Sequence, residues 1–158
     1  MTTRMHYLTL FKSASSGTAG VSRTRTVIAR ELAGWVLFRE YRDSSIDIDA
    51  LAVRTGFPRE EISSFLWDCS GERFFTIRKR LRIADAMEML TDDPGLVLSS
   101  VARATGFQDK SDFRRAFKDE TGYSPRFWRE NGGNRLRCRA AKILEACRSR
   151  CHARCTTS

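Results

Sequence analysis

The sequence has little of what catalysis, export or membrane insertion would require. Histidine occurs only twice, at His6 and His152, near the two ends of the 158-residue chain. No set of nucleophile, base and orienting group stands between them, so we expect no enzymatic activity. No segment has the length and apolar character of a membrane span. The apolar run over residues 7–11 is too short and mixed for a secretory signal. We therefore expect no membrane contact and a cytoplasmic location.

Cysteine is also scarce, and most of it lies at one end. The odd total of five, without an export signal, favours reduced thiols. Cys147, Cys151 and Cys155 follow a helical spacing beside His152. Such thiols could bind a soft metal or oxidise to a disulfide, which leaves a thiol-based metal or redox sensor as one alternative. Because the spacing matches no zinc signature, we favour idle cysteines and predict no metal and no cofactor.

The net charge of +9 is distributed unevenly. Residues 1–25 carry four basic groups and no acidic ones, residues 26–131 carry 17 basic and 18 acidic groups, and residues 132–158 carry seven and one. The middle of the chain is thus nearly neutral. Attraction to phosphates should come from the two ends and from local clusters.

No alternating pattern typical of strands competes with the helical period. Apolar residues recur at spacings of three and four, as at Ile28, Leu32, Trp35 and Val36. The pattern predicts an all-α fold with helices near residues 26–42, 47–55, 58–69, 73–91, 98–105, 110–121 and 125–130. Ser124 followed by Pro125 is typical of a helix start, and the Asp-Asp-Pro-Gly cluster at 92–95 should end the long helix.

One short pattern occurs twice, fifty residues apart. The copies are Ala52-Val53-Arg54-Thr55-Gly56-Phe57 and Ala102-Arg103-Ala104-Thr105-Gly106-Phe107. Each is followed by an apolar pair four apart and then a glycine: Ile62, Leu66 and Gly71 in the first copy, Phe113, Phe117 and Gly122 in the second. A small alanine lets two helices cross closely, and glycine supplies a left-handed turn between them. The repeat predicts two helix-turn-helix units joined by a long connecting helix.

Longer stretches around the repeat carry a family resemblance. They are residues 46–52, residues 80–86 with Met89 and Leu90, residues 106–118 and residues 121–129. From about residue 25 to residue 129 the chain resembles the DNA-binding domain of AraC/XylS-type bacterial transcription regulators. The resemblance implies a regulator that binds double-stranded DNA in two successive major-groove segments and also contacts RNA polymerase. Family members often bind effectors in a separate domain, so we expect no small-molecule effector site within this chain.

The same reasoning predicts the organisation of the chain. Residues 1–22 form a flexible N-terminal lead, residues 23–131 form the DNA-binding domain, and residues 132–158 form a basic Cys/Arg-rich tail. Within the domain, the first unit spans about 26–71, the connecting helix about 73–91 and the second unit about 96–131.

The second unit offers the richer set of DNA-binding side chains. The predicted helix at 110–121 buries its apolar residues and leaves two outward stripes, Lys110, Arg114 and Lys118 on one and Ser111 and Arg115 on the other. Arginine can bond guanine with a bidentate fork, whereas lysine and serine reach phosphates or base edges. The family resemblance places Ser111, Arg114 and Arg115 in the major groove. The alternative is a solvated charged face paired with acidic neighbours.

The first unit offers a poorer set. Its matching positions are Arg59, Glu60, Ser63 and Ser64, and residues 43–71 have a net charge of −4 against +2 for residues 96–131. Glu60 could still accept a hydrogen bond from cytosine N4. We expect the second unit to dominate DNA recognition. The acidic first unit leaves open a degenerate or truncated regulator that acts as a protein-interaction module.

A basic run, Arg78, Lys79, Arg80 and Arg82, marks the connecting helix. It spans more than one helix face, so only part of it could touch DNA. The family resemblance implies a structural role for Arg82. For the others, a solvated face balanced by Asp85 and Glu88 is the default interpretation.

Overall fold

The computed structural model describes residues 3–15 and 23–131, and within these ranges every regular element is helical. The elements are α1 (Thr3–Ser15), α2 (Arg23–Leu37), the short 3-10 helix η1 (Glu40–Arg42), α3 (Ile48–Thr55), α4 (Arg59–Ser70), α5 (Phe74–Asp92), α6 (Leu98–Ala104), α7 (Lys110–Thr121) and α8 (Pro125–Glu130). The all-α prediction is confirmed. No helix among the described residues is long and apolar enough to cross a membrane.

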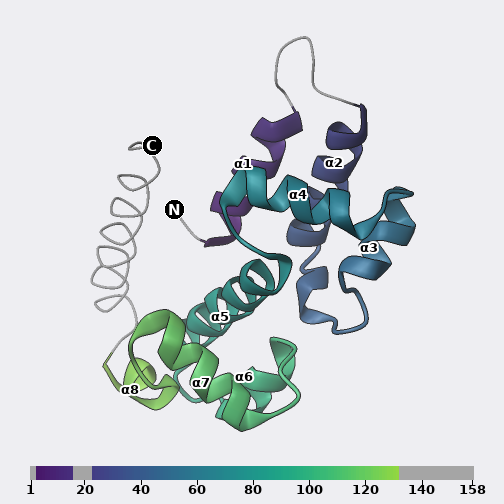
Figure 1. The fold of residues 1–158 in the computed structure, drawn as a ribbon. Helices are drawn as coiled ribbons and strands as arrows, with labels where there is room; N and C mark the ends of the chain where they lie inside the picture. Colours follow the sequence, from purple (N-terminus) through teal and green to yellow (C-terminus); the bar gives the residue numbers. More distant parts are fainter. Residues whose placement is uncertain (1–2, 16–22, 132–158) are drawn as a thin grey trace, which may run out of the picture.

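Two hydrophobic cores divide the described part of the chain, and α5 serves both. The first core lies among α1–α5 and takes Phe74, Ile77 and Leu81 from the start of α5. The second lies among α5–α8 and takes Ile83, Ala86 and Leu90 from the rest of that helix. Figure 1 shows α5 running between the two groups of helices. The predicted arrangement of two units on a connecting helix is therefore observed.

The repeated pattern forms a similar left-handed turn in both units, although α3 ends directly before its glycine and α6 ends one residue earlier. Gly56 and Gly106 have φ angles of 73° and 88°, the left-handed region that glycine tolerates best. The threonine before each glycine turns its hydroxyl back onto its own helix, where Thr55 donates to the Leu51 carbonyl and Thr105 to the Val101 carbonyl. The apolar pairs that follow are buried, and α4 and α7 end at their predicted glycines.

The N-terminal lead differs from its prediction. Residues 3–15 form α1, whose Tyr7 and Phe11 are buried in the first core, with Phe11 packing against Phe65 of α4. The apolar residues at 7, 8 and 11 fall on one face of a helix, and that face is covered by α2, α4 and α5. The short apolar run is thus a packing surface and not a flexible lead.

The helix predicted over 26–42 is broken near its end. α2 stops at Leu37, Arg39 adopts a left-handed φ of 58°, and η1 continues to Arg42. The break turns Tyr41 inward, where its hydroxyl donates to the buried Asp85 carboxylate at 2.8 Å. Arg42 Nε also donates to Asp85, at 2.6 Å.

The basic run of α5 is mostly structural. Arg78 Nε and Arg82 Nε both donate to the Tyr41 carbonyl, at 3.3 and 2.6 Å, which confirms the structural role of Arg82. Arg80 is ion-paired with Glu72 and, at 2.9 Å, with Glu120 of α7. For Arg78 and Arg80 the interpretation of a solvated face balanced by Asp85 and Glu88 is therefore wrong. Backbone carbonyls accept hydrogen bonds from Arg78, and Glu72 and Glu120 pair with Arg80.

Candidate nucleic-acid interface

The outward face of α7 is held in place by its cap and its buried face. The Asp109 carboxylate accepts hydrogen bonds from the backbone amides of Asp112 and Ser111, which lower the pKa of Asp109. Phe113 and Phe117 anchor the helix in the second core. The opposite face exposes all five side chains predicted there, Lys110, Ser111, Arg114, Arg115 and Lys118.

Arg115 makes an ion pair on its own helix. Its guanidinium lies 3.0 Å from Asp112, as the solvated-face alternative anticipated. Both side chains are about two-thirds exposed or more, so water and salt screen the pair, and it holds the guanidinium only weakly. Arg115 therefore stays available to an acceptor outside the protein.

The matching face of α4 is also exposed. Ile62, Phe65 and Leu66 are buried. The predicted residues Arg59, Glu60, Ser63 and Ser64 all face solvent. The structure thus brings together each predicted set on one helix face, α4 or α7, and contact of these nine residues with DNA stays a prediction.

The two cations of α3 and α4 in the first unit each face a carboxylate within the protein. Arg54 lies 2.7 Å from Glu40 and 3.2 Å from Glu31, and the Glu40 bond raises the pKa of Arg54. Arg59 lies 3.2 Å from Asp49. A duplex that approached this unit would meet cations that already face carboxylates.

Four exposed cations of the second unit have no carboxylate partner among the described residues. Lys110, Arg114, Lys118 and Arg103 are exposed, and none of them is ion-paired with another residue of the described ranges. Superimposing the repeat places Arg103 opposite Val53 and Ser99 opposite Asp49. The second unit therefore has a cation and a hydroxyl where the first has an aliphatic side chain and a carboxylate.

The first unit exposes apolar side chains at positions where the second unit has cations. Val53 is 83% exposed, and Trp67, which matches Lys118, is 60% exposed. Asp68 beside Trp67 is ion-paired with Arg25 of α2 at 2.8 Å. This part of α4 is unlike a surface built to bind phosphates.

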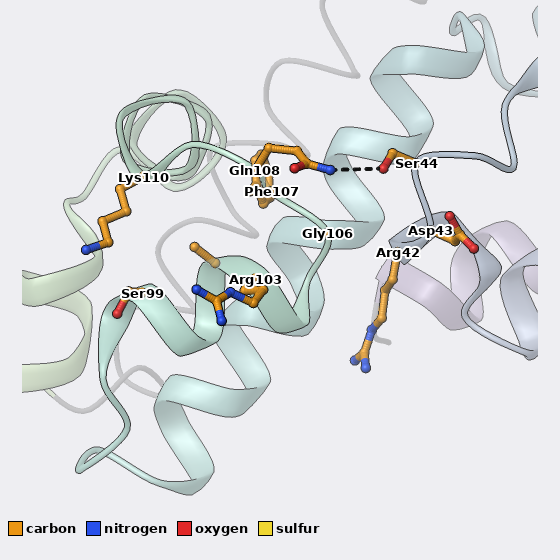
Figure 2. Close-up of a pocket in the computed structure, with 10 residues that line it drawn as sticks. Arg42, Asp43, Ser44, Ser99, Arg103, Gly106, Phe107, Gln108 and Lys110 are labelled. Carbon is orange, nitrogen blue, oxygen red and sulfur yellow. Dashed lines mark hydrogen bonds between the residues drawn. The ribbon is translucent and has the colours of Figure 1, made fainter.

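An open cavity of about 340 Å³ lies where the two units meet. Figure 2 shows Arg103 of α6 and Lys110 of α7 on one side and Arg42 of η1 on the other. The single acidic residue of the lining, Asp43, accepts hydrogen bonds from the Ser45 amide and hydroxyl at 2.8 and 2.7 Å. The cavity is therefore lined by more positive than negative charge.

Sequence reasoning missed Arg42 and Arg103 as members of this lining. Arg103 could have been found, because it lies inside the repeat and differs in charge from its counterpart Val53. Arg42 carried no such signal, since the break after α2 that brings η1 to the second unit is not visible in the helical pattern.

The predicted thiol cluster, Cys147, Cys151, Cys155 and His152, lies outside the described residues. Within residues 3–15 and 23–131, no group of three or more histidine, cysteine or acidic residues could hold a metal ion.

Comparison with known proteins places these features in context. A family model described as a helix-turn-helix domain matches residues 51–131. The chain is 24% identical over 105 residues to a probable transcription factor PqrA of Proteus vulgaris, covering 66% of this chain and 85% of that protein.

Solved structures show the same fold. The C-terminal domain of AraT, a response regulator from Geobacillus stearothermophilus, matches with a TM-score of 0.61 and 21% identity, over 70% of this chain and 88% of that one. The DNA-binding domain of AdpA, a global transcriptional factor solved in complex with a target DNA, matches with a TM-score of 0.60 and 20% identity, over 68% and 94%. Both matches extend beyond a single helix-turn-helix unit.

Proposed function

Because the chain belongs to the AraC-type helix-turn-helix family and is a DNA-binding transcription regulator, we propose that it recognises duplex DNA through two successive major-groove segments, mainly with its second unit. In this proposal α7 makes the base contacts, through Ser111, Arg114 and Arg115. Lys110 and Lys118 contact phosphates. α4 lies in the neighbouring segment and adds little specificity.

The observation that carries the proposal is the set of cations on and beside α7 that have no carboxylate partner among the described residues. A charged group already paired within the protein must give up its partner to bind DNA, whereas an unpaired group on the exposed face replaces only water and counterions. The second unit meets this condition at four positions. The two cations of α3 and α4, Arg54 and Arg59, do not meet it, although the Arg59–Asp49 pair is exposed and therefore the weaker of the two.

The proposal is tested by selecting bound sequences from random duplexes and then titrating the selected duplex at several salt concentrations. We expect a steeply salt-sensitive interaction and a lopsided site, in which one well-defined half lies about one helical turn from a poorly defined half. Enrichment of no sequence, with weak and salt-insensitive binding, would contradict DNA recognition.

A protein contact is the second candidate function, and it concerns the first unit alone. Val53 and Trp67 are exposed apolar side chains on a unit whose cations are already paired, and this surface suits a protein better than a polyanion. RNA polymerase is the partner that the family resemblance implies. Replacing Trp67 with Lys, its counterpart in the second unit, should weaken polymerase recruitment in a transcription assay without weakening DNA binding. Equal loss of both would assign Trp67 to the DNA interface instead.

A further inference from the structure

We propose that the junction cavity between the two units binds a phosphate group, and that its occupant in the DNA complex is a backbone phosphate between the two half-sites. That the bound phosphate belongs to DNA rests on the proposed function. That the cavity binds phosphate at all is argued from the side chains that line it. Arg103 and Arg42, the residues central to it, lie outside the predicted base-contacting sets.

The charges around the cavity favour an anion. Arg42, Arg103 and Lys110 come from three different elements and line one space, together with the hydroxyl groups of Ser44 and Ser99. Guanidinium and ammonium groups with hydroxyl donors are the side chains that bind phosphate oxygens. Arg42 is already bonded to Asp85, but that carboxylate also lies 3.6 Å from Arg39. One carboxylate shared between arginines leaves positive charge uncompensated.

A second observation is that the walls of the cavity are fixed. The backbone of Gly106 lies so close to Arg42 that a Cβ added to the glycine would come within 2.1 Å of the Arg42 carbonyl oxygen. Arg82 donates to that same carbonyl at 3.2 Å, and burial lowers the pKa of the Arg82 guanidinium to about 10. Above the cavity, Gln108 of the second unit donates to the Ser44 hydroxyl of the first at 3.4 Å (Figure 2). The backbone that carries Arg42, Ser44 and Gly106 is therefore held in place before binding, which reduces the ordering cost when a ligand arrives.

The first unit provides a comparison within the same molecule. Its positions equivalent to Ser99, Arg103 and Lys110 are Asp49, Val53 and Arg59, where the single cation is paired with the carboxylate. The same backbone pattern thus carries unpaired cations only in the second unit, where α6 and α7 line the junction cavity. Helix-turn-helix geometry by itself does not demand them.

The test uses the full chain and the variant Arg103→Gln, with Arg30→Gln as a control, since Arg30 is an exposed cation on α2 that does not line the cavity. One phosphate contact contributes about 0.9 to the slope of log K against log salt, equivalent to roughly fivefold in affinity near physiological salt. We expect Arg103→Gln to reduce the salt slope by about 0.9 and the affinity by roughly fivefold, without a change in base preference. Arg103→Lys should retain both, and Arg30→Gln should change neither.

A second arm separates the sources of the phosphate. Inorganic phosphate is titrated into the DNA-free protein while backbone amide signals are followed by NMR. Saturable shifts confined to residues 42–44 and 99–110, and lost in Arg103→Gln, would support the site. If phosphate caused these shifts but Arg103→Gln left the salt slope of DNA binding unchanged, the occupant of the site would be a free phosphate compound and not DNA.

The absence of both effects would overturn the proposal. That result would be distinct from failure of the proposed function, because Arg115→Ala would still weaken binding and relax preference at one position of a duplex that the wild type selects. Conversely, phosphate shifts in a wild-type protein that selects no duplex would keep the site and reject the DNA-binding proposal.

Discussion

In the first unit Arg54 and Arg59 each face a carboxylate, whereas in the second Arg103, Lys110 and Arg114 face solvent. The helices, the left-handed glycine and the buried apolar pair are the same in both. Apolar and glycine positions therefore determine the fold, while the exposed positions between them determine what each copy can bind. Two copies of one motif need not share one function.

The glycine of the repeat should give the largest measurable contrast between the units. Alanine at either position meets a positive φ, which costs about 1–2 kcal/mol. At Gly106 the added Cβ also meets the Arg42 carbonyl oxygen at 2.1 Å, whereas at Gly56 nothing lies within 4 Å. Overpacking adds about 1–3 kcal/mol. Gly106→Ala should lower the free energy of unfolding by about 2–5 kcal/mol in urea denaturation, and Gly56→Ala by only about 1–2 kcal/mol. Equal losses of unfolding free energy in the two variants would show that the residues around Gly106 move to accommodate the added methyl group.

The second contrast compares the two recognition helices. Arg115→Ala should weaken DNA binding by about 1–3 kcal/mol and relax preference at one position of the site. Ser64, its counterpart on α4, has a short side chain with little reach, so Ser64→Ala should cost much less. Titration of one selected duplex measures both. A larger loss from Ser64→Ala would mean that the first unit dominates recognition.

How much of this asymmetry the sequence could predict depends on the range of the interactions. The repeat predicted both units, their turns and the outward residues of α4 and α7, because glycine, buried pairs and helical spacing are local signals. It did not predict that α1 would pack on the first core, because a short apolar run acquires a partner only in three dimensions. Nor did it predict the role of Arg78, whose acceptors are carbonyls of residues 41 and 43.

Transferring the charge pattern from one unit to the other gives a gain-of-function test. Asp49→Ser with Val53→Arg would give the first unit the residues that the second has at Ser99 and Arg103. Both positions are exposed, and Val53 has room because it is 83% exposed. The change frees Arg59 and adds a cation, so we expect roughly fivefold tighter binding and a steeper salt slope. Val53→Gln is the matched control, and a double variant that binds no better than this control would show that α3 does not approach phosphates.

The smallest effect concerns Glu60, an exposed acid in the first turn of α4 that matches Ser111 on α7. A carboxylate some 8–10 Å from a phosphate in water repels it by only a fraction of a kcal/mol, so Glu60→Gln should tighten binding by at most about twofold. The neighbouring Glu61→Gln removes the same charge from a position outside the predicted base-contacting set and serves as the control. If Glu60 instead accepts a hydrogen bond from cytosine N4, Glu60→Gln would weaken binding and reduce a cytosine preference that Glu61→Gln leaves intact, because an amide oxygen is a weaker acceptor than a carboxylate. Selection from random duplexes with both variants distinguishes these outcomes. A weakened cytosine preference in Glu60→Gln would show that the first unit also recognises bases. The two units would then differ only in how strongly they bind DNA.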